Sequence, residues 1–169
     1  VMLNGQNHKG SSYHIGRQII DKMSGENDIT EFFFPKDLDH FCPGCYKCIE
    51  DDTACPYYGE KKIILEAIND ADLLVITTPT YCMHVSAPLK SFIDMTFDYW
   101  MVHRPKKCMF RKRAVVISTS AGAGTKSAIK DHPLDGSKGI PDIGHTGCFI
   151  SFHFQCIGYS RCDHSIIFY

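Results

Sequence analysis

Short apolar runs alternate along the chain with segments whose apolar residues recur every three or four positions. We expect strands in four of these runs, at residues 1–3, 29–34, 73–76 and 114–117. The helical spacing predicts helices over residues 15–23, 63–70 and 86–95. The four strands thus alternate with three helices, and the two later strands are apolar enough to be covered on both faces. This order predicts an α/β fold with a doubly wound parallel sheet and helices on both of its faces.

The pattern changes after Lys130. Residues 131–169 show no helical stripe, although residues 149–154 favour a fifth strand. A fold of this type should end with a strand and an amphipathic helix, and the sequence has no candidate for that last helix. We therefore expect one domain at residues 1–130, with residues 131–169 as its atypical C-terminal completion or extension. A chain of 169 residues leaves little room for a second full domain.

Composition and charge argue against several classes of protein. A formal net charge of −1 lacks the basic excess of a nucleic-acid-binding protein. No apolar stretch approaches the ~18 residues of a membrane-spanning helix, and the first residues are too polar for a secretory signal. We therefore expect a cytoplasmic protein that binds neither nucleic acid nor membrane. In that reducing compartment, its nine cysteines are expected to be thiols or metal ligands.

Four of these cysteines form a compact run, C-x2-C-x2-C-x6-C, made of Cys42, Cys45, Cys48 and Cys55. Close spacings of this kind hold iron–sulfur clusters, whereas structural zinc sites use widely separated pairs. Pro43 and Gly44 permit the tight backbone that a cluster requires. The acidic residues at positions 50–52 act against it, because negative charge disfavours four thiolates. Three interpretations stay open: a [4Fe–4S] cluster, a reduced structural loop, and a zinc site.

Three loops follow predicted strands, at residues 5–12, 77–84 and 118–124. Ligands of doubly wound sheets bind at this edge. The first loop opens a helix, so its N–H groups favour a phosphate, although it matches neither the dinucleotide fingerprint nor the P-loop. The alternative is a polar turn with Ser11 or Ser12 as the N-cap. The second loop suits a planar ligand, and the small residues of the third permit close backbone approach.

These loops resemble the flavodoxin-like, NAD(P)H-dependent FMN reductases. Residues 4–12 are similar to their phosphate loop N-G-S-P-R-x-x-G-N-T. Residues 71–81 are similar to their segment A-D-x-I-I-x-x-[ST]-P-V-Y, and residues 87–94 to their helix A-x-L-K-x-F-[IL]-D. The cysteine run falls where the iron–sulfur flavoprotein branch of the family carries its compact cysteine motif. The resemblance covers residues 1 to about 130, and the order of its segments makes it specific.

The resemblance implies FMN as the cofactor and a flavodoxin-like fold. Six residues of the first loop would surround the phosphate: Gln6, Asn7, His8, Gly10, Ser11 and Ser12. The second and third loops would flank the isoalloxazine ring with Pro79, Thr80, Tyr81, Cys82, Met83, Ser120, Ala121 and Gly122. Two departures stand out. Residues 6–8 replace the usual Ser-Pro-Arg, so an expected arginine is missing, and residues 82–83 stand where Phe-Gly is common.

The function implied is an FMN-dependent oxidoreductase that passes electrons from NAD(P)H, the co-substrate, to a quinone, a flavin or another small acceptor. The flavin carries this chemistry, so we nominate no catalytic side chain. The alternative is an iron–sulfur flavoprotein, an electron carrier or redox sensor between protein partners. In that case Cys42, Cys45, Cys48 and Cys55 would be the metal ligands. A homodimer or homotetramer is also implied.

Overall fold

The computed structural model describes residues 1–23, 25–101, 106–130, 150–155 and 165–168. The first half of the chain contains β1 (Met2–Asn4), α1 (Ser11–Asp21), β2 (Glu31–Phe33), α2 (Lys47–Glu50), the 3-10 helix η1 (Asp52–Ala54) and α3 (Tyr58–Asp70). The second half contains β3 (Leu73–Pro79), α4 (Ala87–Met95), α5 (Phe97–Met101), the 3-10 helix η2 (Lys107–Arg111), β4 (Arg113–Ser120), α6 (Thr125–Lys130), β5 (Ile150–Gln155) and β6 (Ser165–Phe168).

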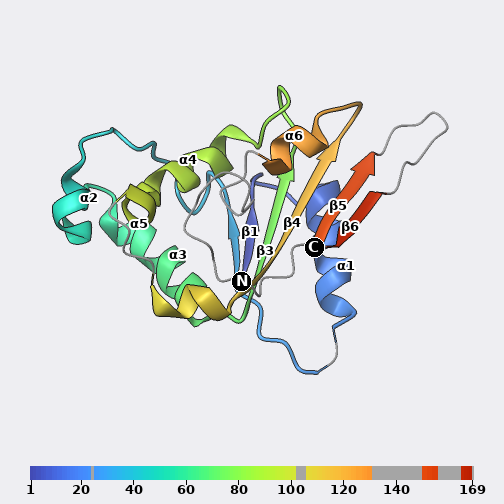
Figure 1. Cartoon of the computed structure of the whole chain (residues 1–169), viewed down its shortest axis with the longest axis horizontal. Coiled ribbons are helices and arrows are strands. Elements are labelled where there is room, and N and C mark those ends of the chain that lie inside the picture. Colours follow the sequence, from blue (N-terminus) through green and yellow to red (C-terminus); the bar gives the residue numbers. More distant parts are fainter. Residues whose placement is uncertain (24, 102–105, 131–149, 156–164, 169) are drawn as a thin grey trace.

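The strands form one six-stranded sheet in the order β2-β1-β3-β4-β5-β6. Strands β1 to β5 run parallel to one another, and β6 lies antiparallel to β5 at the edge. Figure 1 shows α1 on one side of the strands and α3, α4 and α5 on the other. The predicted flavodoxin-like doubly wound fold is confirmed. No helix among the described residues is long and apolar enough to cross a membrane.

Both faces of the sheet are buried because side chains alternate along its central strands. In β3, Leu74 and Ile76 join the core under α3 and α4, whereas Val75 joins the core under α1. Helix α1 packs closely at Gly16, where a Cβ atom would lie 2.7 Å from Cε of Met2 and 3.0 Å from Cγ2 of Thr77. The sheet therefore holds helices against both faces and leaves its strand ends open to the loops.

The strands β4, β5 and β6 can be compared with the sequence predictions for the C-terminal part of the sheet. Strand β4 continues to Ser120, three residues beyond its apolar run, because the polar residues after Ile117 pair with β3 and β5. Strand β5 confirms the strand expected near residues 149–154. The last described element is the antiparallel strand β6, where a normal fold completion would have a helix. Residues 131–149, part of the atypical C-terminal segment, lie outside the described residues.

Candidate functional site

The three predicted loops meet at the carboxyl edge of the parallel sheet, after β1, β3 and β4. The Gly5 N–H donates to the Thr77 carbonyl at 2.7 Å, and the Ser86 hydroxyl donates to the Gly5 carbonyl at 2.6 Å. A Cβ atom on Gly5 would lie only 2.6 Å from Ser86 Oγ, so glycine is required at this crossing. The first loop is therefore pinned to the second where it leaves its strand.

Hydroxyl groups join the same edge across to β4. The Thr80 N–H donates to the Thr119 carbonyl at 2.7 Å, and the hydroxyls of Thr80 and Ser118 share a hydrogen bond of 2.7 Å. The hydroxyls of Ser12 and Thr119 share another of 3.0 Å. Residues far apart in the sequence thus form one hydrogen-bonded rim, and a ligand bound there would contact all three loops.

The first loop leads directly into α1. Gly10 is the N-cap and supplies no capping side chain, and the first turn contains no acidic residue. The first N–H groups of the helix are therefore available to an oxygen anion. The alternative with Ser11 or Ser12 as N-cap is wrong, because Ser11 already begins the helix. The phosphate ligands proposed for this helix start are Gln6, Asn7, His8, Gly10, Ser11 and Ser12.

The second loop contains a tight turn at residues 81–84. Tyr81 and His84 exchange backbone hydrogen bonds of 3.0 and 2.9 Å. Between them Cys82 and Met83 have φ values of 50° and 71°, in the left-handed region that glycine favours. This conformation explains why glycine is common in this part of the family motif. The turn presents Tyr81 and Met83 at the surface, with exposed fractions of 54% and 49%.

The third loop closes against this turn. Gly124 has a φ of 99°, and a Cβ atom there would lie 2.7 Å from Met83 Sδ. Ser120, at the end of β4, has a hydroxyl oxygen that is buried and lacks a hydrogen-bond partner among the described residues. Such an oxygen is unfavourable unless a ligand or water satisfies it. Ala121 and Gly122 follow it and are exposed.

A direct side-chain bridge spans the first two loops. The Gln6 amide donates to the Tyr81 hydroxyl at 2.7 Å. Sequence reasoning assigned these two residues to different ends of the ligand, and their separation of 75 positions gives no signal for the contact. An uncapped helix start, an unsatisfied hydroxyl and an exposed tyrosine now lie along one rim. They suit a planar ligand that carries a phosphate, so the predicted FMN residues fit that cofactor.

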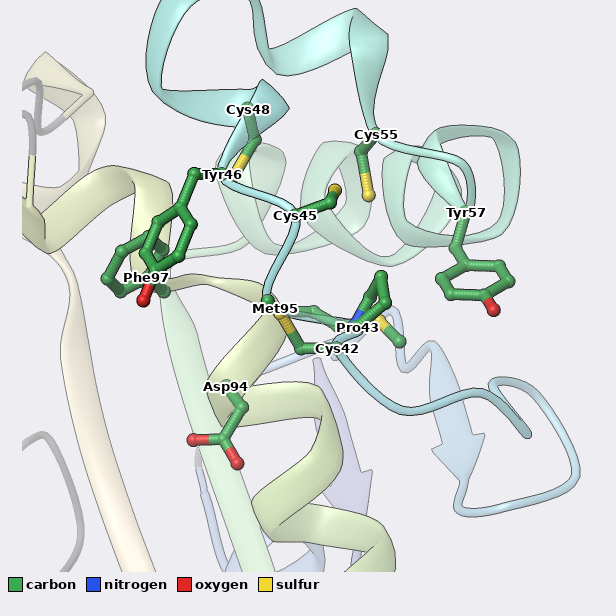
Figure 2. Close-up of a pocket in the computed structure, with 11 residues that line it drawn as sticks. Cys42, Pro43, Cys45, Tyr46, Cys48, Cys55, Tyr57, Asp94, Met95 and Phe97 are labelled. Atoms are coloured by element: carbon green, nitrogen blue, oxygen red, sulfur yellow. The ribbon is translucent and has the colours of Figure 1, made fainter.

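The four cysteines of the compact run line one pocket. Figure 2 shows Cys42, Cys45, Cys48 and Cys55 around this hollow, with Met95 of α4 and Phe97 of α5 along its wall. The cysteine loop turns sharply, because Gly44 and Tyr46 have φ values of 65° and 58°. The structure therefore brings the predicted metal ligands together, and metal binding stays a prediction.

The geometry of the thiols bears on the kind of metal. Zinc bonds of ~2.3 Å to sulfur imply sulfur–sulfur edges of about 3.8 Å. Among the described residues, no three cysteine sulfurs lie within 4.8 Å of one another. The ligand atoms of Asp39, His40 and Glu60 do lie within that distance of one another. Burial, and then the nearby Asp98 carboxylate, raises the pKa of the Cys48 thiol.

Comparison with solved structures supports the fold. The chain is similar to an FMN-dependent NADH-azoreductase from Bacillus anthracis, with a TM-score of 0.61 and 13% identity over 90% of this chain and 85% of that one. It is also similar to the Trp repressor binding protein from Bacillus subtilis, with a TM-score of 0.58 and 19% identity over 93% of this chain and 88% of that one. At these identities the likeness concerns the fold alone.

Sequence comparison places the chain more narrowly. It is 27% identical to an iron-sulfur flavoprotein of Methanocaldococcus jannaschii, over 72% of this chain and 62% of the relative. It is 29% identical to an iron-sulfur flavoprotein of Archaeoglobus fulgidus, over 56% of this chain and 46% of the relative. The chain thus spans less than two thirds of the length of either relative. Residues 1–132, which include all three loops and the cysteine pocket, match the sequence pattern of the NADPH-dependent FMN reductase family. The chain belongs to that family.

Proposed function

We propose that the chain is an FMN-dependent oxidoreductase that passes electrons from NAD(P)H through bound flavin to a quinone, a flavin or another small acceptor. The observation that carries this proposal is the rim of three loops, in a chain that belongs to the FMN reductase family. FMN, when bound, accepts a hydride and releases electrons singly or in pairs. The protein has to bind it, orient it and leave one side open to other reactants.

The residues of the rim divide this work. The start of α1, with the polar side chains of the first loop, holds the phosphate. Lys9 is the cationic residue of that loop in place of the arginine common in the family, and Lys9 Nζ lies 5.2 Å from the centre of the Tyr13 ring. Two segments flank the ring of the flavin, Pro79 to Met83 on one side and Ser120 to Gly122 on the other. No side chain is proposed to transfer a proton.

The exposed turn at residues 81–84 favours a small, flat electron acceptor. Tyr81 and Met83 offer aromatic and thioether surface that is more than 45% exposed, and a quinone or a second flavin would stack on such surface. By resemblance, we also propose that the protein assembles as a homodimer or homotetramer and works in the cytoplasm.

The second candidate is an iron–sulfur flavoprotein that carries electrons between protein partners. It is favoured by the cysteine pocket, which is lined by all four cysteines of the compact run. Helix α4 begins beside the flavin rim at Ala87 and ends at Met95 in the pocket wall. Its eight residue steps of ~1.5 Å place the two ends of the helix about 12 Å apart along its axis.

One experiment separates the two candidates. The protein is purified without oxygen and assayed for FMN, iron and sulfide, and then for NADH and NADPH oxidation with a quinone. The oxidoreductase requires stoichiometric FMN and rapid turnover with quinone. A carrier retains flavin, iron and sulfide but turns over slowly. Failure to bind added FMN would reject both. The Cys48→Ser variant should lose iron and keep flavin, and Cys108→Ser, outside the pocket, should lose neither.

A further inference from the structure

Three side chains with metal-binding groups converge beside the cysteine pocket, and none of them lines it. His40 Nε2 lies 3.2 Å from Asp39 Oδ1 and 3.3 Å from Glu60 Oε1, and the three ligand atoms all lie within 4.8 Å of one another. Asp39 and His40 precede the first cysteine of the run, whereas Glu60 follows the last one, in the first turn of α3. The trio therefore brings together the two ends of the cysteine loop.

A proton on His40 accounts poorly for this arrangement. Nε2 of a protonated imidazole carries a single N–H, so it can point at only one of the two carboxylates at a time. Both distances also exceed the ~2.7–2.9 Å of a charge-assisted N–H···O bond. The carboxylates of Asp39 and Glu60 repel each other unless a cation lies between them. A cation that all three groups reach together satisfies them better than a proton does.

The distances match those of a zinc site. Zinc binds imidazole nitrogen at ~2.0–2.1 Å and carboxylate oxygen at ~2.0–2.2 Å, so neighbouring ligand atoms of a tetrahedral site lie about 3.4 Å apart. The two measured distances from His40 Nε2, 3.2 and 3.3 Å, are close to that value. The imidazole nitrogen favours zinc over calcium and magnesium, because those two ions take oxygen ligands.

The histidine is held in place by the protein itself. Its ring stacks on Tyr57, with ring centres 4.2 Å apart and an angle of 16° between the planes, and its carbonyl oxygen accepts from the Ser91 hydroxyl of α4 at 2.5 Å. Figure 2 shows Tyr57 at the edge of the cysteine pocket. The His40 side chain is nevertheless 38% exposed, so an ion can reach it from solvent. The nitrogen ligand is thus oriented in advance and accessible.

We propose that Asp39, His40 and Glu60 form a zinc site, separate from any metal that the cysteines hold. One imidazole nitrogen and two carboxylate oxygens bind the ion, and water takes the remaining position. The ion links residues 39–40 to residue 60, and a metal that closes a loop in this way stabilises the folded state. It therefore fastens the segment that carries all four cysteines. The site does not depend on which candidate function is correct.

The test uses Co²⁺ as a visible substitute for zinc, added without oxygen to FMN-loaded protein that has been dialysed against a chelator. Difference absorption spectra separate the ligands, because thiolates give cobalt an intense charge-transfer band, whereas nitrogen and oxygen ligands give only weak ligand-field bands. Once any thiol sites are saturated, we expect one further cobalt ion whose spectrum lacks the charge-transfer band and which zinc displaces. Glu60→Gln and His40→Phe should weaken this site about tenfold or more. Phenylalanine keeps the ring that stacks on Tyr57, so this variant retains the local packing.

Glu66→Gln is the matched control, because Glu66 also lies in α3, has a side chain that is 60% exposed and pairs with Lys62 instead. It should bind the further cobalt ion as the wild type does. Saturating zinc should raise the unfolding temperature of the wild type and of Glu66→Gln more than that of Glu60→Gln. A wild-type protein without the further ion, or equal binding by Glu60→Gln and Glu66→Gln, would overturn the inference. FMN content and NAD(P)H oxidation of the same samples test the proposed function separately.

Discussion

Gly5 should be the glycine least tolerant of substitution at the rim. It leaves β1 at the crossing of the first and second loops, where its carbonyl accepts from the Ser86 hydroxyl. A Cβ atom there would lie 2.6 Å from Ser86 Oγ, 3.1 Å from the Thr77 carbonyl oxygen and 3.1 Å from Thr78 Oγ1. All three atoms belong to buried residues that have little freedom to withdraw. Gly5→Ala therefore has to move the two loops apart.

The expected loss comes from two sources. Overpacking a buried site by one methyl group costs typically 1–3 kcal/mol. Displacing the Ser86 hydroxyl also breaks its hydrogen bond, worth about 1 kcal/mol. We expect Gly5→Ala to lower the free energy of unfolding by about 2 to 4 kcal/mol. FMN affinity should fall as well, because the loop separation changes the distance between the phosphate and ring positions.

The assay is urea denaturation of the FMN-free protein together with titration of FMN by quenching of flavin fluorescence. Gly59→Ala is the matched control, since a Cβ atom on this helical glycine meets nothing within 4 Å. It should leave FMN binding unchanged and add up to about 1 kcal/mol of stability. If Gly5→Ala were as stable as the wild type and bound FMN equally well, the two loops could not be in the close contact described above.

Three further predictions concern the rim and the core. Ser120→Ala should not destabilise the FMN-free protein, because the Ser120 hydroxyl has no hydrogen-bond partner among the described residues. It should nevertheless weaken FMN binding by about 5-fold, or ~1 kcal/mol. Ser118→Ala should lower the free energy of unfolding of the FMN-free form, because it removes the hydrogen bond to the Thr80 hydroxyl. Cys82→Gly should raise the free energy of unfolding by about 1 kcal/mol, and Cys82→Ala should give no gain, because only glycine relieves the left-handed backbone. Burial, with help from Asp98, raises the pKa of Tyr99 to about 12, so its stabilising effect is complete below pH 10 and is lost as the pH rises toward 12. The stability difference between the wild type and Tyr99→Phe, followed by urea denaturation, should change within that window and stay constant below it.

The sequence alone was sufficient to predict the parallel strands and the three loops that follow β1, β3 and β4. The apolar runs at residues 73–76 and 114–117 are unbroken, and only a strand covered on both faces needs that pattern. Because parallel strands end at one edge, finding the strands also located the loops. The cysteine spacing likewise brought its four residues to one pocket. These features depend on local pattern and on topology, and both can be derived without coordinates.

Other features depend on contacts between distant residues and left no local signal. Lys61 lies among helix residues whose sequence pattern is that of an exposed face. Its burial depends on the contact with Asp98, 37 positions later, which the local sequence does not indicate. The strand β4 was cut short because serine and threonine after Ile117 are typical of loops, yet pairing with β3 and β5 keeps them in the sheet. The strand β6 pairs antiparallel with β5, and its short apolar run, Ile166 to Phe168, gave no sign of that pairing. In each case the partner, rather than the residue itself, decides the structure.

Helix α4 connects the two sites more firmly than loops would. Its N-cap Ser86 donates to Gly5 at the flavin rim, and its last residue, Met95, lines the cysteine pocket. Leu89 and Phe92 between them are 0% and 4% exposed and pack into the core under β3. A helix whose apolar face is buried cannot shorten or bend without opening that core. The distance between the rim and the cysteine pocket is therefore set by the fold.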